Sequence, residues 1–303
     1  MELEKLNFKS QELEARLGFH PGKFTTPNKT LAFILATLAC MAFYTALHFL
    51  DTQWPQSRFT AIFTQRGFIP YVITFGFCWG WALVWMKAQK ADTQASALTM
   101  LLNRNFGCYR FTPQNAHDWQ AWLDRQAEKP QDYILLNRLK VAFSTLGNMG
   151  QPASLPDVLN HHAESDELQV DGSYSSVNTV LFALPILGFI GTVLGLGAAI
   201  GGFGQTLSSG TANLDGLIGS LQGVAGGLSV AFDTTLLALV GTLALQIYAS
   251  HLRAHETAFL EDCNFFMQNE FYPNLRNQSE PGETLPFTTA LHRRDVNHHV
   301  TQA

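Results

Sequence analysis

The sequence predicts an all-α integral membrane protein with four transmembrane helices and a helical cytoplasmic insert between the second and third. Three observations support this fold class. Hydrophobic residues make up 47% of the 303 positions and charged residues only 14%, whereas an average soluble protein has about 25% charged residues. Four long runs lack any charged side chain or carry a single acid. Lys and Arg are distributed unevenly between the segments that join these runs.

The four apolar runs are each long enough to cross a bilayer, which takes roughly 20 residues in a helix. A transmembrane hairpin is predicted over 30–86, with spans at about 30–50 and 67–86. A second pair is predicted over 176–250, with spans at about 176–203 and 226–250. The second pair is longer than a bilayer requires, so we expect tilt or extension beyond the bilayer.

Lys and Arg counts predict that both chain ends face the cytoplasm, because cytoplasmic segments are enriched in these residues. The N-terminal tail (1–29) contains five, the 51–66 loop two, the 87–175 segment eight, the 204–225 loop none, and the chain after Ser250 four. The first apolar run follows 29 mostly polar residues, and no small-residue cleavage pattern follows it. We therefore expect it to remain as a signal-anchor helix.

The 87–175 segment is predicted to be helical. One helix is expected between Asp132 and Gly147, because apolar residues recur there at helical spacing. They are Leu135, Leu139, Ala142, Phe143 and Leu146. Ser154 and Asp157 resemble a capping box for a further helix. Trp119 and Trp122 share a face of a short helix, where we expect packing against neighbouring helices or lipid headgroups.

The 251–303 segment is predicted to continue the fourth span as a helix and to end in a disordered tail. The helix has an apolar stripe made of Leu252, Phe259, Leu260, Phe266 and Met267. From Pro273 onward the chain is polar and is expected to be disordered. The four cysteines lie far apart, so neither a disulfide framework nor a zinc site is predicted. The His-containing runs at 161–162 and 298–299 are expected to be solvated, and no metal site is predicted.

The third and fourth spans contain the candidate functional residues. Between Asp171 and Arg253 only Asp215 and Asp233 are charged. An ionised residue inside a span costs roughly 2.5–3.5 kcal/mol on insertion scales, so it usually faces a cavity, a partner or an ion path. Four threonines lie in the same two spans: Thr192, Thr234, Thr235 and Thr242. They indicate a polar lumen or seam, or else each hydroxyl bonds to its own helix.

Glycines predict close helix packing in the same spans, because lipid provides no hydrophobic drive for helix association and small residues let backbones approach. Gly188, Gly191, Gly195 and Gly197 mark span three. Gly216, Gly219, Gly223 and Gly227 recur at three- or four-residue intervals into span four. The spacing fits packing between subunits of an oligomer and packing within one chain equally well.

Two motifs in these spans resemble a known family. Leu184-Pro-Ile-Leu-Gly-Phe-Ile-Gly-Thr-Val-Leu-Gly is similar to the third-helix signature of the MotA/TolQ/ExbB proton-channel family. Gly227-Leu-Ser-Val-Ala-Phe-Asp-Thr-Thr-Leu-Leu-Ala-Leu, with Ile247-Tyr248 after it, is similar to the last helix of that family. The four-span layout resembles the MotA branch, whereas the Gly-Thr-Val motif resembles TolQ and ExbB. The resemblance covers roughly residues 130–265.

The resemblance implies roles for individual residues. Thr192 and Thr234 would line the central pore, and Thr235 replaces Thr234 if the register differs by one residue. Pro185 would be the proline near the start of the third helix. Asp233 departs from the family pattern, which usually has a small or apolar residue there. Leu243 also departs, because the TolQ and ExbB branch often has proline. Thr242 is also predicted to lie on the ion pathway, and Gly188, Gly191, Gly195 and Gly227 are predicted to serve helix packing and gating.

The resemblance also implies an assembly and a function. Five subunits would form a ring in the bacterial inner membrane around two copies of a single-span protein of the ExbD, TolR or MotB type. The partner would supply the proton-carrying intramembrane aspartate, and H⁺ or Na⁺ flow would drive rotation or other work by this motor. The chain would be its stator or energiser subunit, with no cofactor besides the transported ion and no nucleic-acid partner. The alternative is a passive oligomeric channel or scaffold without a motive-force partner.

Asp233 has two alternative roles on sequence grounds. It could face the pore or the partner seam and take part in ion passage. It could instead form a hydrogen bond at a subunit interface, either protonated or capped by threonine. An enzyme is not predicted, because His48 is the one histidine in the four spans and no acid accompanies it there. Ser229 likewise has no evident base.

Overall fold

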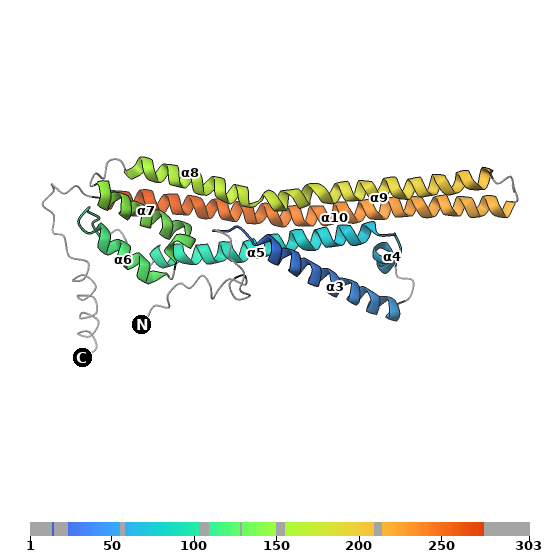
Figure 1. Ribbon diagram of the computed structural model, residues 1–303, viewed down its shortest axis with the longest axis horizontal. Helices are drawn as coiled ribbons and strands as arrows, with labels where there is room; N and C mark the ends of the chain where they lie inside the picture. Colours follow the sequence, from blue (N-terminus) through green and yellow to red (C-terminus); the bar gives the residue numbers. More distant parts are fainter. Residues whose placement is uncertain are drawn as a thin grey trace. The chain divides into compact units, whose positions relative to one another are not determined.

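The computed structural model describes residues 14, 24–54, 58–102, 109–127, 129–149, 155–208 and 214–275. These residues fold almost entirely as α-helices (Figure 1). The chain divides into two compact units. Unit 1 comprises 1–26, 87–173 and 254–303, and unit 2 comprises 27–86 and 174–253. Because α5 and α10 are long, each contributes residues to both units.

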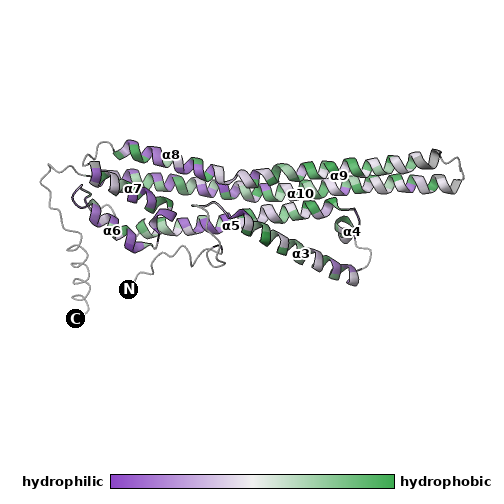
Figure 2. Cartoon of the chain, viewed as in Figure 1, coloured by the Kyte–Doolittle hydropathy of each residue, from purple (hydrophilic) through white to green (hydrophobic). Residues whose placement is uncertain are grey.

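Unit 2 contains the apolar helices. They are α3 (Lys29–Gln53), the first half of α5 (Ile69–Leu102), α9 (Ser175–Ser208) and most of α10 (Leu214–Phe266), with the short α4 (Arg58–Thr64) after α3. The described chain has four helices long and apolar enough to cross a membrane, which confirms the four predicted spans. Hydrophobic residues predominate along these helices (Figure 2).

The helices of unit 2 alternate in direction. The ring of Phe33 packs edge-on against Phe75, and Tyr44 stacks on Tyr71, so α3 and α5 are antiparallel. Helices α5 and α9 are antiparallel, because Ile69 lies near Gly191 while Gly80 lies near Val180. The Trp81 ring stacks on Tyr248 at 5.1 Å, and Gly241 lies near Phe77, so α5 and α10 are parallel. This alternation is what four consecutive membrane crossings require.

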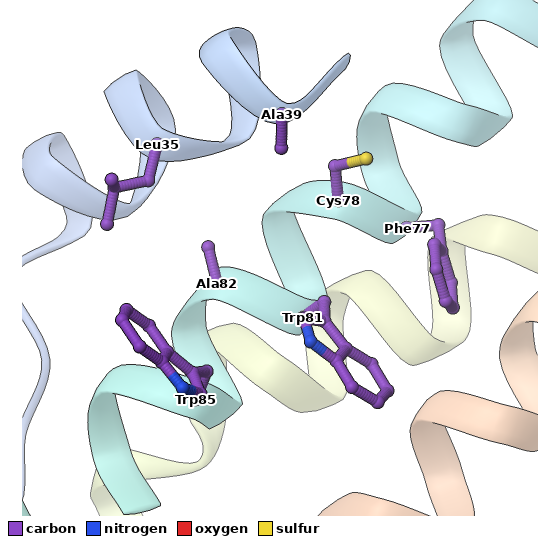
Figure 3. Close-up of a pocket in the computed structure, with 7 residues that line it drawn as sticks. All are labelled: Leu35, Ala39, Phe77, Cys78, Trp81, Ala82 and Trp85. Carbon is purple, nitrogen blue, oxygen red and sulfur yellow. The ribbon is translucent and has the colours of Figure 1, made fainter. Parts of the chain in front are cut away.

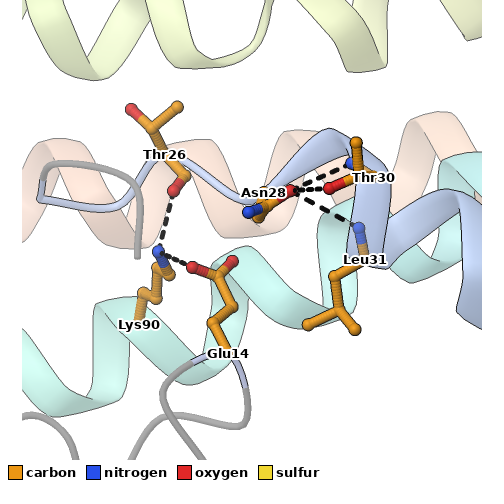
Figure 4. A network of polar contacts seen from close by, with 6 residues as sticks. All are labelled: Glu14, Thr26, Asn28, Thr30, Leu31 and Lys90. Carbon is orange, nitrogen blue, oxygen red and sulfur yellow. Dashed lines mark hydrogen bonds and ion pairs between the residues drawn. The ribbon is translucent and has the colours of Figure 1, made fainter. Parts of the chain in front are cut away.

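The start of α3 and the start of α5 are each defined by local chemistry. The Asn28 side chain accepts hydrogen bonds from the backbone N–H groups of Thr30 and Leu31, which caps α3 (Figure 4). Gly67 has φ +80°, a conformation that residues with a Cβ rarely adopt, and it lies in the turn that leads into α5. The turn therefore depends on glycine at this position.

The α9–α10 hairpin is held together by direct backbone approach. A methyl group at Gly195 would lie 2.7 Å from the Gly227 carbonyl oxygen and 2.9 Å from the Ala231 nitrogen. One at Gly188 would lie 2.6 Å from the Ala238 Cβ. The four predicted packing glycines thus serve contacts within one chain. By contrast, a methyl group added at Gly197, Gly219 or Gly223 would have no described neighbour within 4 Å.

Two predicted boundaries were wrong. Residues 204–225 were expected to be a loop, but α9 continues to Ser208 and α10 begins at Leu214. The stretch was assigned to a loop although its glycines recur at helical spacing, and glycine is tolerated in membrane helices. The 273–303 tail was expected to be disordered, yet Tyr272–Asn274 form a 3₁₀ turn and Leu275 forms a parallel β-bridge with Phe111. Residues after Leu275 lie outside the described residues.

Unit 1 is a helical body with its own apolar core. It contains the end of α5, α6 (Ala116–Gln126), the 3₁₀ turn Pro130–Asp132, α7 (Ile134–Met149), α8 (Leu155–Ser173), the end of α10 and a π-turn, Met267–Phe271. The predicted apolar faces of α7 and of the α10 continuation are buried, as are Trp119 and Trp122. Ser154 of the predicted capping box lies outside the described residues.

Buried ion pairs connect the helices of unit 1. The Lys87 ammonium lies 2.9 Å from a Glu256 carboxylate oxygen, and both side chains are almost fully buried. The same ammonium donates to the hydroxyls of Thr25 and Ser173. Nearby, Lys90 pairs with Glu14 at 2.8 Å and donates to the Thr26 carbonyl (Figure 4). Lys87 therefore joins α5, the end of α8 and α10 at one point.

We expect Lys87→Met to lower the stability of the protein by about 3–5 kcal/mol, because it removes the buried ammonium that pairs with the buried Glu256 carboxylate. Lys140→Met is the matched control, since Lys140 pairs with Asp124 at 2.7 Å with both side chains well exposed, and exposed pairs contribute at most about 1 kcal/mol. Thermal unfolding of the detergent-solubilised full chain measures both. Equal losses in the two variants would contradict the role given to Lys87.

We expect Gly195→Ala to destabilise the α9–α10 hairpin by about 1–3 kcal/mol, since the added methyl group meets backbone that cannot move aside. Gly197→Ala is its control, two residues along the same helix, where a methyl group meets nothing within 4 Å. Alanine favours helix over glycine by about 1 kcal/mol, so Gly197→Ala should not destabilise unit 2. The same unfolding measurement decides, and a larger loss for Gly197→Ala would refute this packing scheme.

Candidate functional site

Two threonine hydroxyls meet between α9 and α10. The Thr192 and Thr235 hydroxyls are hydrogen-bonded to one another. Each also reaches the Gly188 carbonyl at 3.2 Å, and the Ala231 carbonyl lies 3.2 Å from Thr192 and 3.0 Å from Thr235. Each hydroxyl therefore has three acceptors for one proton, so the pair can exchange hydrogen bonds while staying satisfied. Both side chains are partly exposed.

The hairpin packing explains why these two threonines meet. Gly188 and Gly191 bring α9 so close to α10 that Thr192, one turn further along, faces the next turn of α10. The contact is antiparallel: Gly188 faces Ala238, and Gly195 faces Ala231. Thr235 lies between those two levels. The sequence spacing of glycine and threonine on α9 therefore positions the Thr192 hydroxyl opposite that of Thr235.

Thr234 is in a different environment. It is fully buried, and a methyl group at Gly191 would lie 2.7 Å from its Cβ and 3.1 Å from Ile69 of α5. Its hydroxyl donates to carbonyls of its own helix, at Val230 and Ala231. The structure thus brings Thr192 together with Thr235, the alternative register, and places Thr234 inside the helix bundle. Thr242 also bonds to its own helix, at the Ala238 carbonyl.

The threonine pair lies at the level where α5 begins, because Ile69 is the first residue of α5 and contacts Gly191. From Thr192, α9 continues to Ser208, and α10 starts at Leu214, well before Thr235. At 1.5 Å per residue the hairpin extends about 24 Å beyond that level. Large apolar side chains on this extension are exposed in the single chain: Val193, Leu194, Leu196, Ile200, Ile218 and Leu221.

Asp233 forms an ion pair with Arg66. The Arg66 Nε lies 2.7 Å from an Asp233 carboxylate oxygen, and the two side chains are 25% and 22% exposed. The Ser229 hydroxyl donates to the same carboxylate over 3.4 Å. Arg66 lies in the turn between α4 and α5. Arg66 was not predicted as a site residue, because Arg58 and Arg66 both lie in the same predicted loop and nothing in their spacing distinguishes them.

Pro185 lies inside α9. Proline has no backbone N–H, so it removes one hydrogen bond from the helix and bends it. It precedes Gly188 by three residues and is therefore one turn from the start of the close contact with α10. Leu243, at the other departure from the family pattern, is 62% exposed.

A cavity of about 470 Å³ lies between α3 and α5 in unit 2 (Figure 3). Its walls are formed by Leu35, Ala39, Phe77, Cys78, Trp81, Ala82 and Trp85. This lining is apolar and carries no acid or base. The cavity therefore fits a hydrocarbon environment, and it lies apart from the threonine pair.

One of three comparisons with known proteins gave a match. The model of the MotA/TolQ/ExbB proton channel family matches residues 126–263, which include the end of α6, α7, α8, α9 and nearly all of α10. Comparison with curated proteins gave no match, and comparison with solved structures gave none. The matched segment contains both threonines and all the glycines of the close helix contact. Over residues 126–263, which are 138 of the 303 residues, the chain is similar to the MotA/TolQ/ExbB proton channel family.

Proposed function

We propose that this chain is the ion-conducting subunit of a membrane motor that uses the proton or sodium motive force to drive a single-span partner. The Thr192–Thr235 hydroxyl pair is the observation that carries the proposal. It provides exchangeable hydrogen bonds on a helix pair whose other exposed side chains are mostly apolar. The family whose model matches residues 126–263 is one of proton channels rather than of enzymes.

The ion path in this proposal runs along the face of α9 and α10 that carries Thr192 and Thr235. An ion or proton that leaves water needs oxygen atoms to replace its hydration. The two hydroxyls offer such oxygens while carrying no charge. Thr234 is assigned a packing role instead, because its side chain is fully buried and packs against Gly191 of α9.

The proposal includes a ring of copies of this chain, with five as the expected number. In the single chain, exposed apolar side chains cover both α9 and α10, among them Phe189, Ile190, Phe232 and Leu239. Contacts between copies would cover part of this surface, and lipid would cover the rest. The ring would then enclose the threonine-bearing faces, with two copies of an ExbD-, TolR- or MotB-like partner at the centre.

The partner is required for work in this proposal. A charge that crosses about 100 mV yields roughly 2.3 kcal/mol, and a second body must move for that energy to be used. Both chain ends and unit 1 are placed in the cytoplasm of a bacterium, following the Lys and Arg distribution. In the alternative, a passive channel or scaffold, the ring forms without a partner.

We expect Thr192→Val and Thr235→Val each to reduce ion flux about tenfold, the effect of a barrier raised by one lost hydrogen bond of about 1.4 kcal/mol. Flux is measured in proteoliposomes that contain the full chain and its co-purified partner, with a trapped pH- or Na⁺-sensitive dye and an imposed potential. Thr37→Val is the matched control, because Thr37 is exposed on α3 and its hydroxyl bonds only to the Phe33 carbonyl among the contacts seen. Unchanged flux in both test variants would refute the assigned path.

We expect a protein with one transmembrane segment, and an aspartate within that segment, to co-purify with the tagged full chain isolated from its native membrane. Mass spectrometry of the purified complex identifies the partner, and native mass spectrometry gives the ratio of the two chains. A five-to-two ratio agrees with the proposed motor. A homo-oligomer that conducts ions with no second protein present would favour the passive channel.

A further inference from the structure

The Arg66–Asp233 ion pair lies on a different face of α10 from the proposed ion path. Asp233 and Thr235 are two residues apart, so their side chains point about 200° from one another around the helix. Asp233 faces Arg66 of the turn before α5, whereas Thr235 faces Thr192 of α9. The carboxylate is therefore directed away from the hydroxyl pair.

The charge of the pair differs from that of a proton-carrying acid. Arg66 is a guanidinium, which does not lose its proton in proteins. With an opposite charge 2.7 Å away, Asp233 contributes a neutral pair to the span rather than a lone charge. That neutrality reduces the cost of an acid at this position in a span. An acid that loads and releases protons would instead have to change the net charge at this place in each cycle.

The Arg66–Asp233 ion pair joins the turn before α5 to α10, and both of these segments influence the position of Thr235. Arg66 is followed by Gly67, whose φ of +80° turns the chain into α5. Ile69 then contacts the Gly191 backbone, which packs on Thr234. The start of α5 is thus linked to α10 directly through charge at Asp233, and indirectly through Gly191 of α9, which packs on Thr234. Both links lie within two residues of Thr235.

We propose that Arg66 and Asp233 form a positioning pair that fixes the start of α5 on α10 and thereby sets the place of Thr235, and that Asp233 carries no proton along the ion path. This inference goes beyond the proposed function. Its flux readout rests on that function, but its stability readout does not. The expected signature is coupling: each charge is harmful only when the other is missing.

The test uses four variants of the full chain: Arg66→Gln, Asp233→Asn, the double variant with both changes, and Arg58→Gln. Arg58 is the matched control, because it is exposed and is the other arginine of the same loop. Thermal unfolding in detergent is measured for each, and flux is measured in proteoliposomes with the co-purified partner. The double variant replaces the ion pair by two amides, which can hydrogen-bond to one another.

We expect both single variants to unfold at a temperature several degrees lower and to lose flux, since each leaves a charge without its partner in the span. The double variant should recover most of the stability and most of the flux, and Arg58→Gln should match the wild type. Rescue of flux in the double variant is the decisive result, because a chain without Asp233 would then still conduct.

Three results would overturn the proposal. The first is a double variant as deficient in flux as Asp233→Asn alone, which would make Asp233 an ion carrier. The second is a loss of stability in the double variant equal to the sum of the two single losses, which would show that Arg66 and Asp233 are not energetically coupled. The third is wild-type behaviour of both single variants. If even the wild-type chain conducts no ions, the proposed function fails. The unfolding temperatures then still decide whether Arg66 and Asp233 form a positioning pair.

Discussion

The close backbone contact between α9 and α10 is the constraint on which the rest of unit 2 depends. At Gly195 and Gly227 there is no room for a Cβ between the two helices. This approach fixes the register of the hairpin, and the register decides which hydroxyls meet. A residue with a larger side chain at either glycine would separate the helices and break the Thr192–Thr235 hydrogen bond. Packing and the candidate ion path are therefore one feature of the structure.

A second constraint acts where the spans join unit 1. There Lys87 is buried with Glu256 and with two hydroxyls from other segments. Burying charges is costly, and removing one partner of such a pair is costlier still. The network thus connects α5, the end of α8 and α10 within unit 1.

Much of this arrangement could be predicted from the sequence, because apolar runs and small residues report directly on membrane crossing and close packing. The four spans and the packing glycines followed from such local signals. The choice between Thr234 and Thr235 did not, since adjacent residues differ by about 100° around a helix and only the partner helix defines which face matters. Arg66 was missed for a similar reason: an ion pair between residues 66 and 233 depends on the fold. The early start of α10 at Leu214 was missed, although Gly216, Gly219 and Gly223 recur at helical spacing.

In the proposed ion path, Thr192 and Thr235 are lining residues and Thr234 is not. Cysteine accessibility tests this assignment most directly, in a background where the native cysteines are serine. Thr192→Cys, Thr235→Cys and Thr234→Cys are each incorporated with the partner into proteoliposomes and treated with a small charged thiol reagent. We predict that the reagent blocks ion flux through the Thr192→Cys and Thr235→Cys proteins and leaves the Thr234→Cys protein conducting. Block at Thr234→Cys with none at Thr235→Cys would contradict the account.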